Sequence, residues 1–188
     1  MQKYLCQWIG ISNVIPSGRR GSRDLNHNKM DIRIGNGYDV HALAEGLPLW
    51  LGGVQIDSIK GCIAHSDGDV AIHALCDALL GALALGDIGR HFPDTSDEFK
   101  GIDSKILLKR TMQLVKGLGF KVGNADITIA MQRPKLAPYI PAMRETLSAL
   151  MEVPITRVSV KATTTEKLGF VGREEGCAVF ATALLLAE

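Results

Sequence analysis

Two histidines and one aspartate have the residue types and the spacing of a metal site. Asp39 and His41 are two residues apart, so in an extended segment their side chains project to one side while Val40 faces the core. His73 adds a second imidazole. Three protein ligands with an open fourth position are typical of a catalytic zinc. The pattern leaves one alternative open, in which His73 is a core histidine hydrogen-bonded to a carboxylate.

His73 belongs to residues 64–80, the segment around which the rest of the chain is organised. Beyond Asp69 this segment is almost entirely apolar, which predicts a helix buried nearly all round. Ser66 and Asp69 have the spacing of a capping box, so we expect the helix to begin at Ser66. Asp69, His73 and Asp77 recur every four residues and form one polar line along it. Buried polar groups of this kind need partners.

The remaining pattern predicts one domain, residues 30–188, in which strands alternate with helices. Such alternation indicates an α/β sandwich with a mixed sheet whose helices cover one face. Residues 87–95 are expected to form an irregular loop, because glycine and proline interrupt regular structure there. The expected strands are 32–38 followed by a loop, 49–56 interrupted at Gly52-Gly53, 121–131, 157–162 and 177–185, and the expected helices are 66–86, 103–116 and 138–152.

The last expected strand, residues 177–185, is apolar on nearly every position of both faces, and Thr182 is its polar exception. A strand of this composition is buried on both sides of its sheet. Because helices are expected on only one side, the other side is predicted to meet another subunit.

Composition excludes several classes of protein. The chain has 188 residues, of which 46% are hydrophobic and 22% charged, and this is ordinary for one globular domain. A formal net charge of +1 gives no indication of a nucleic-acid partner. No apolar run has the length of a membrane span. The cysteines have no C-x-x-C spacing and are expected to be reduced thiols in a cytosol-like compartment: Cys6, Cys62, Cys76 and Cys177.

Residues 1–29 differ in charge from the rest, with five basic side chains and one acidic side chain. A basic leader that contains serine is consistent with an organellar transit peptide and hence with a plastid location. It lacks a clear amphipathic helix, and Met30 stands just before the expected domain. These two features favour a non-native or poorly ordered leader and a cytoplasmic protein.

Three blocks of sequence indicate a family. They read IGNGYDVHAL, GCIAHSDGDVAIHALCDALLGALALGDIGRHFPDT and VSVKATTTEKLGFVGREEG. In order and spacing they resemble the 2-C-methyl-D-erythritol 2,4-cyclodiphosphate synthases, over the chain from about residue 32 to its end. The resemblance implies conversion of 4-diphosphocytidyl-2-C-methyl-D-erythritol 2-phosphate into the 2,4-cyclodiphosphate with release of CMP, in the non-mevalonate isoprenoid pathway.

The same resemblance implies the metals. Zn²⁺ would be held by Asp39, His41 and His73, and Mg²⁺ or Mn²⁺ by Glu166 together with substrate phosphates. Before Glu166 stands a run of three threonines, residues 163–165, whose hydroxyls suit phosphate oxygens. A threonine run is also common in strands that bind nothing.

Roles for other residues also follow from the resemblance. His65 and Thr164 are implied as catalytic groups that stabilise developing charge, and Asp69 is expected to orient a zinc histidine. His91 lies outside the family's metal set and is expected to be a surface histidine. Met131 stands where the family more often has a small residue. The implied substrate-binding residues, from the phosphates through the alcohol to the cytidine, are Asp39, Val40, His41, His65, Ser66, Asp87, Ile88, Gly89, Phe92, Pro93, Asp94, Thr95, Ser96, Met131, Gln132, Arg133, Pro134, Lys135, Leu136, Ala137, Thr163, Thr164, Thr165, Glu166, Phe170 and Arg173.

The family resemblance implies a homotrimer with active sites between adjacent subunits. We take the zinc ligands and Glu166 to belong to one subunit and the loop around Lys135 to its neighbour. Phe170 and Arg173 resemble residues near the threefold axis, where an isoprenoid diphosphate could bind. The alternative is that Arg173 pairs with a neighbouring glutamate, Glu174 or Glu175.

Two other classes of function fit part of the pattern. A zinc phosphohydrolase would use the same three ligands, because they do not reveal whether water or phosphate takes the open position. A non-catalytic trimeric isoprenoid-binding module would leave the metal ligands and Glu166 without a role.

Overall fold

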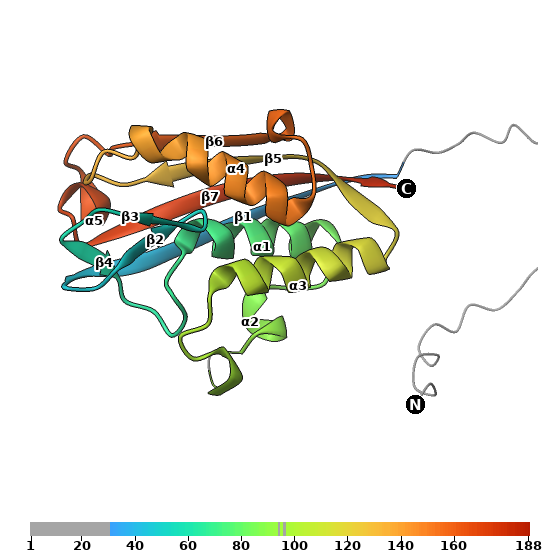
Figure 1. Ribbon diagram of the computed structural model, residues 1–188, viewed down its shortest axis with the longest axis horizontal. Coiled ribbons are helices and arrows are strands. Elements are labelled where there is room, and N and C mark those ends of the chain that lie inside the picture. Colours follow the sequence, from blue (N-terminus) through green and yellow to red (C-terminus); the bar gives the residue numbers. More distant parts are fainter. Residues whose placement is uncertain (1–30, 94, 96) are drawn as a thin grey trace, which may run out of the picture.

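A five-stranded mixed sheet forms the centre of the computed structural model, which describes residues 31–93, 95 and 97–188 (Figure 1). The strand order is β4-β1-β7-β5-β6, with β5 and β6 parallel and the other neighbouring pairs antiparallel. The leader, Asp94 and Ser96 lie outside the described residues. The five strands are β1 (Ile32–Glu45), β4 (Lys60–Cys62), β5 (Phe120–Ala130), β6 (Val158–Thr163) and β7 (Gly176–Ala187).

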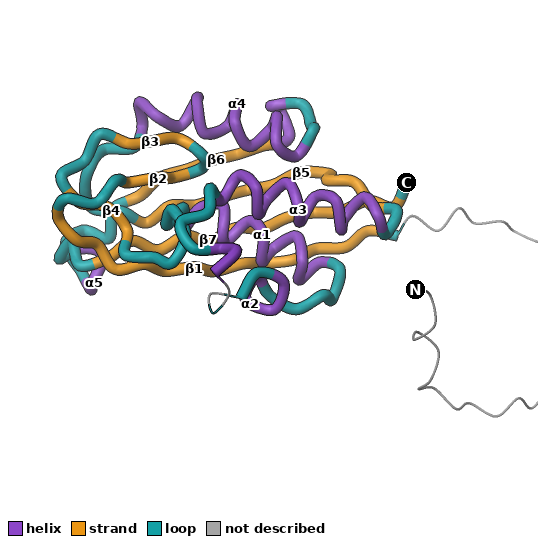
Figure 2. The backbone as a smooth tube through the Cα atoms, turned by 60° about the horizontal axis from the view of Figure 1, so that its bottom comes forward, coloured by secondary structure: helices purple, strands orange, loops and turns teal. Residues whose placement is uncertain are grey.

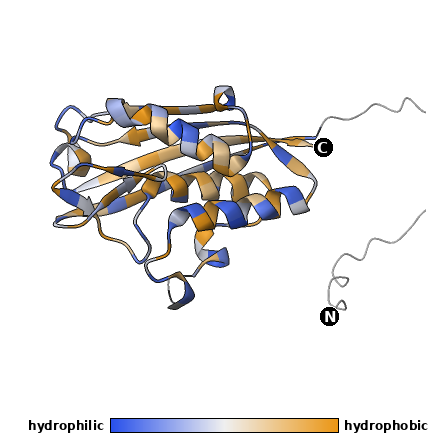
Figure 3. Ribbon diagram, viewed as in Figure 1, coloured by the Kyte–Doolittle hydropathy of each residue, from blue (hydrophilic) through white to orange (hydrophobic). Residues whose placement is uncertain are grey.

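Three long helices lie on one side of this sheet (Figures 1 and 2). They are α1 (Val70–Ala82), α3 (Ser104–Gly117) and α4 (Ile140–Met151). Figure 3 colours α1 mainly as hydrophobic, whereas α3 alternates between hydrophobic and hydrophilic residues. Helix α1 is therefore the central helix, and the predicted sandwich with helices on one face is confirmed. None of the described helices is long and apolar enough to cross a membrane.

The smaller elements connect these layers. Strands β2 (Leu49–Leu51) and β3 (Val54–Ile56) form a separate two-stranded hairpin. The short helices are α2 (Ile88–His91) and α5 (Gly169–Gly172), and the 3-10 turns are η1 (Asp97–Phe99), η2 (Ala137–Tyr139) and η3 (Ile155–Arg157).

Strand β1 approaches α1 very closely because glycines face the helix. A Cβ atom on Gly37 would collide with the carbonyl oxygen of Ala74, and one on Gly35 would collide with that of Ala78. The helix meets these glycines with alanines, so both partners of the contact are small. This contact fixes the position of α1 over the strand that carries Asp39 and His41.

We expect Gly37→Ala to lower the free energy of unfolding by about 1–3 kcal/mol or more, since the new methyl group meets backbone that cannot move independently. Gly117→Ala is the matched control. Its Cβ would meet nothing within 4 Å, and alanine favours the helix, so it should be neutral or stabilise by up to about 1 kcal/mol. Denaturant unfolding of both variants checks this. Equal stabilities would contradict the close contact.

The sheet face opposite the helices is open in the single chain. It carries exposed apolar side chains, among them Ile34 (70% exposed), Tyr38 (48%) and Phe180 (49%). The rings of Tyr38 and Phe180 contact each other with centroids 4.7 Å apart. Val40 is 45% exposed on this face, so the prediction that it faces the core is wrong. The last strand was predicted to be buried on both faces. In the single chain, its face opposite the helices stays partly exposed.

Strand β1 is longer than predicted. It continues past Tyr38 to Glu45 because β7 pairs with it as far as Ala42 and β4 pairs with it beyond that point. The stretch 49–56 is a hairpin that turns at Gly52 and Gly53, both with positive φ, rather than one interrupted strand. The three-residue strand β4 was not predicted. The other predicted strands and the predicted helices 103–116 and 138–152 agree with the structure within about two residues.

The predicted bounds of the central helix are wrong at both ends. Asp69, not Ser66, is its N-cap, and the Asp69 side chain accepts a hydrogen bond from the backbone N–H of Ile72. The helix ends at Ala82, and Ala84 then adopts a positive φ of 56°. The capping box is absent because the Ser66 hydroxyl accepts instead from the N–H of Gly68.

The described cysteines agree with the prediction of reduced thiols. Cys62, Cys76 and Cys177 are free and buried, while Cys6 lies outside the described residues. The sulfurs of Cys62 and Cys177 are 3.7 Å apart.

Candidate metal centre and active site

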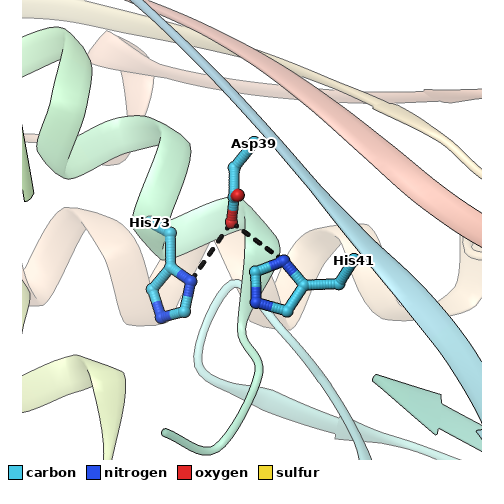
Figure 4. A group of neighbouring side chains, drawn as sticks. All are labelled: Asp39, His41 and His73. Carbon is cyan, nitrogen blue, oxygen red and sulfur yellow. Dashed lines mark hydrogen bonds and ion pairs between the residues drawn. The ribbon is translucent and has the colours of Figure 1, made fainter. Parts of the chain in front are cut away.

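Asp39, His41 and His73 converge on the helix-facing side of β1, as their spacing predicts (Figure 4). Asp39 Oδ2 lies 3.1 Å from His73 Nδ1 and 3.3 Å from His41 Nδ1. One potential ligand atom from each residue lies within 4.8 Å of the other two. The strand supplies two ligands and α1 the third, so the close packing of these two elements sets the geometry of the group.

The electrostatics of this group favour a cation. Burial alone would raise the pKa of the Asp39 carboxyl, but its contacts with His41 and His73 outweigh burial and lower the pKa to about 2. Burial lowers the pKa of His41, and the Asp39 carboxylate more than compensates, so the net shift is upward. A carboxylate that stays ionised is the state in which it ligates a metal.

One nitrogen of this group lacks a hydrogen bond. His41 Nδ1 is buried and has no hydrogen-bond partner among the described residues, because its contact with Asp39 does not have hydrogen-bond geometry. Buried polar atoms are rarely left in this state. A divalent ion shared by two imidazoles and a carboxylate is consistent with this arrangement, and the residues therefore fit a zinc site.

The other ring nitrogen of His73 contacts two hydroxyl groups. His73 Nε2 lies 2.9 Å from Ser104 Oγ and 3.1 Å from Ser66 Oγ. The Ser104 hydroxyl in turn donates a hydrogen bond to the Asp67 carboxylate. His73 therefore has polar partners on both ring nitrogens, and its 3.1 Å contact with Asp39 also agrees with the alternative of a buried histidine hydrogen-bonded to a carboxylate.

Asp69 does not orient His73, and this prediction is wrong. Its carboxylate accepts from the N–H groups of Gly52 at 2.8 Å, Gly53 at 2.6 Å and Ile72 at 3.0 Å. Burial raises the pKa of Asp69 and these backbone hydrogen bonds counteract part of that effect. Asp69 thus caps α1 and fastens the β2–β3 turn to it.

Asp77 has a hydrogen-bond partner different from those of Asp69 and His73. The three polar residues along α1 therefore have three separate sets of partners. The Asp77 carboxylate accepts from the backbone N–H of Ile88 at 2.7 Å. Asp87 accepts from the N–H of Arg90 at 2.9 Å, as a capping residue does. These two acids stabilise the single turn α2, so the prediction that 87–95 lacks regular structure is wrong for residues 88–91.

The implied alcohol-binding positions lie in and after this turn. Asp87 and Gly89 are exposed, and Ile88, Phe92, Pro93 and Thr95 follow the same surface segment. Among them the structure tests only the capping by Asp87, so their contacts with substrate stay predictions. His91 is half-buried and its Nε2 lies 3.1 Å from the carbonyl oxygen of Leu85. The expected surface histidine is therefore only partly exposed.

The threonine run and the implied cytidine loop lie side by side. The N–H of Met131 donates to the carbonyl of Thr163 at 2.9 Å, and the N–H of Lys167 donates to Gln132 Oε1 at 3.4 Å. Thr164 Oγ1 donates to Glu166 Oε1 at 2.7 Å. Met131 is only 4% exposed and belongs to the hydrophobic core.

Within the chain, the neighbours of Glu166 differ from those predicted. Glu166 follows β6, and both β7 and β5 lie between β6 and the strand β1 that carries the zinc ligands. Within one chain, Glu166 therefore groups with the loop around Lys135 rather than with the zinc ligands. His65 is exposed and directly precedes Ser66, whose hydroxyl lies 3.1 Å from His73 Nε2.

The alternative for Arg173 is confirmed. Its guanidinium forms two parallel 2.9 Å hydrogen bonds with the carboxylate of Glu175. Glu174 instead lies 3.4 Å from Arg133. Phe170 is 38% exposed. Binding of an isoprenoid diphosphate at Phe170 and Arg173 stays a prediction.

Ser104 and Asp67 were missed by reasoning from the sequence. The available signal was a polar residue on the buried side of an amphipathic helix, because Ser104 lies on α3 with the buried residues Leu107 and Leu108. Nothing local in the sequence indicated that this serine reaches His73.

Comparison with known proteins identifies the family of the chain. The model of the YgbB family matches residues 32–186. The chain is 58% identical over 159 residues to the 2-C-methyl-D-erythritol 2,4-cyclodiphosphate synthase of Porphyromonas gingivalis, covering 85% of this chain and 98% of that protein. It is 62% identical over 156 residues to the enzyme of the same name from Azotobacter vinelandii, covering 83% and 99%.

Solved structures show the same fold. The bifunctional IspDF from Campylobacter jejuni matches with a TM-score of 0.82 and 47% identity, over 85% of this chain and 43% of that protein. A 2C-methyl-D-erythritol-2,4-cyclodiphosphate synthase in a CDP-bound form matches with a TM-score of 0.76 and 44% identity, over 81% and 99%. The chain therefore belongs to the YgbB family of 2-C-methyl-D-erythritol 2,4-cyclodiphosphate synthases.

Proposed function

We propose that this chain converts 4-diphosphocytidyl-2-C-methyl-D-erythritol 2-phosphate into 2-C-methyl-D-erythritol 2,4-cyclodiphosphate and CMP, a step of isoprenoid precursor synthesis. The observation that carries the proposal is the group of Asp39, His41 and His73 in a chain whose family match spans residues 32–186. A solved relative in a CDP-bound form supports a cytidine nucleotide as ligand. The domain of residues 30–188 is then the catalytic unit, and its proposed location is the cytoplasm.

The reaction needs no nucleophile from the protein. An oxygen of the 2-phosphate attacks the β-phosphorus of the same molecule, and the bond from that phosphorus to the bridging oxygen breaks. CMP leaves with the bridging oxygen, and the new P–O bond closes the ring, as in a phosphorus-oxygen lyase. A phosphoryl transfer of this kind depends on alignment and on stabilisation of charge.

The zinc ligands are assigned to Asp39, His41 and His73 because their donor set and the unpartnered His41 nitrogen fit such an ion. An ion held by these three residues would neutralise negative charge on a phosphate. Asp39 contributes the negative charge that retains a cation, and the two imidazoles contribute neutral nitrogen donors. His65 is exposed and directly precedes Ser66, whose hydroxyl lies 3.1 Å from His73 Nε2, and its proposed role is to stabilise charge that develops on the phosphates.

Glu166 is the proposed ligand of Mg²⁺ or Mn²⁺. Its carboxylate stands at an exposed loop and accepts a hydrogen bond from Thr164, whose hydroxyl is a proposed catalytic group. A single carboxylate completed by phosphates and water is the usual way in which Mg²⁺ is held. The neighbouring loop, residues 131–137, is the proposed cytidine site.

The open apolar sheet face supports the proposed homotrimer. Monomeric soluble proteins rarely expose a broad apolar surface, and a symmetric assembly would cover it. An active site between adjacent subunits would combine the zinc ligands of one chain with Glu166 and the cytidine loop of its neighbour. This division follows the strand order of the chain, in which those two groups are separated.

The activity is tested by incubating the purified protein with the cytidylyl substrate and quantifying all phosphorus products. We expect CMP and the cyclic diphosphate in equal amounts. Linear methylerythritol phosphates without cyclic product would instead identify a zinc phosphohydrolase. Binding of isoprenoid diphosphates without any turnover would indicate a binding module.

The shared site predicts complementation between inactive variants. Co-refolding His73→Ala with Glu166→Gln should restore about one quarter of wild-type activity, because random trimers place both intact halves at that share of interfaces. Glu166→Gln mixed with a variant disabled in the loop around Lys135 is the matched control. Both lesions then lie in the same half and should not complement. No recovery in verified mixed trimers of the first pair would contradict the shared site.

A further inference from the structure

We propose that Ser104 and Asp67 are positioning residues that hold the His73 ring in the tautomer required for metal binding. The inference rests on the zinc site of the proposed function and adds two residues to it. Neither is a metal ligand. Both act through hydrogen bonds on the side of the ring that faces away from Asp39.

The first step is the orientation of the ring. His73 Nδ1 faces the metal-ligand group, since it lies 3.1 Å from Asp39 Oδ2. His73 Nε2 points the opposite way and lies 2.9 Å from Ser104 Oγ. A ligating imidazole nitrogen must present its lone pair, so the ring proton has to be on the other nitrogen. Metal binding through Nδ1 therefore requires a proton on Nε2 and an acceptor for it.

The second step is the direction of each hydrogen bond. A serine hydroxyl has one proton, and that of Ser104 is donated to the Asp67 carboxylate, which can only accept. The Asp67 carboxylate also accepts from the backbone N–H of Ser104 at 2.9 Å and of Asp69 at 3.1 Å, which fixes its position. Ser104 Oγ therefore faces His73 with its lone pairs. It accepts the Nε2 proton and disfavours the tautomer that would block Nδ1.

The hydroxyl of Ser66 is the second one near Nε2, and it constrains the tautomer of His73 less than Ser104 does. It lies 3.1 Å from Nε2 and is only half-buried, and apart from His73 no acceptor for its hydroxyl proton is found among the described residues. Its proton can therefore turn toward His73 or toward a ligand. Ser104 is fully buried at the start of α3 and has its proton committed to Asp67. Only Ser104 imposes one direction on the hydrogen bond.

The experiment measures zinc affinity rather than turnover. Metal-free full-length protein is titrated with zinc against a chromophoric chelator, and unfolding of the metal-free forms is followed in parallel. Ser104→Ala should weaken zinc binding by about 10- to 100-fold, the range found when partners of metal-bound histidines are removed. Ser104→Thr retains the hydroxyl and should restore most of the affinity.

Ser148→Ala is the matched control. Ser148 is also buried on a helix, but its hydroxyl donates to the backbone carbonyl of Glu145, away from the metal ligands. It should bind zinc as the wild type does. Asp67→Ala provides an independent variant if Ser104→Ala is too unstable to titrate. It removes the acceptor of the Ser104 hydroxyl proton, which can then turn toward Nε2, and it should also weaken zinc binding.

Three outcomes would overturn the proposal. Wild-type affinity in Ser104→Ala would show that the hydroxyl does not act on the metal site. Equal weakening in Ser104→Ala and Ser148→Ala would attribute the loss to general destabilisation. A wild-type protein that binds no zinc would overturn both this inference and the zinc assignment, whereas the first two results leave that assignment intact.

Discussion

Replacing His73 with alanine is expected to lower zinc affinity and turnover together by more than about 100-fold, since even loss of a residue that only supports a ligand costs roughly 10- to 100-fold. His73 is one of three proposed ligands, and its loss would leave the ion with only Asp39 and His41 from the protein. Alanine is the best helix former, so α1 should persist. Zinc content by atomic spectroscopy, CMP release and circular dichroism measure the three effects.

The control for this variant is His91→Ala. His91 is a half-buried histidine that contacts the carbonyl of Leu85 and lies outside the metal-ligand group. Its zinc content should remain that of the wild type. Full zinc occupancy in His73→Ala would refute the assigned ligand set, and zinc loss in both variants would indicate an indirect effect of destabilisation.

The pairing of Asp39 with His41 was predictable because it follows from local spacing and does not depend on the rest of the fold. Two residues at a distance of two along a strand share a face, and this places Asp39 beside His41. Alternation does not say which face of a strand is covered. Which face of β1 is covered depends on Gly35 and Gly37, whose lack of a side chain lets α1 pack on the face that carries Asp39. The exposure of Val40 was therefore mispredicted although the convergence of the ligands was correct.

The ends of elements were less predictable, because they depend on partners distant in sequence. Strand β1 extends to Glu45 only because β7 and β4 supply hydrogen bonds there. Turn α2 forms because Asp77, eleven residues before Ile88, accepts its N–H. Neither contact has a local signature. By contrast, α3 was predicted closely, since its amphipathic pattern and the Asp103 cap are both local.

The roles of polar side chains were the hardest to predict. Asp69 had the spacing to orient His73, but the turn at Gly52 and Gly53 offers two N–H groups that its carboxylate accepts. The side chain that contacts the His73 ring is instead Ser104, which belongs to a different helix, α3. Spacing along a helix identifies which side chains share a face. It does not identify what packs against that face.

Glu166→Gln should separate the two proposed metals. Glutamine keeps the shape of the side chain, and its amide oxygen can still accept the hydrogen bond from Thr164, so the loop should be retained. The negative charge that attracts Mg²⁺ or Mn²⁺ is lost. We expect turnover to fall by about 10²- to 10³-fold, the cost of removing one group that stabilises transition-state charge. Zinc content should not change, because Glu166 lies apart from the zinc ligands.

The decisive measurement is the dependence of CMP release on magnesium concentration. If Glu166 holds the ion, the variant should need far more magnesium than the wild type and should stay slow at saturation. Glu145→Gln, at an exposed position of α4, removes the same charge elsewhere and should leave the magnesium dependence unchanged. Near-normal activity of Glu166→Gln at limiting magnesium would exclude Glu166 as the ligand. A parallel loss of zinc would show instead that the loop and the zinc ligands form one structural unit.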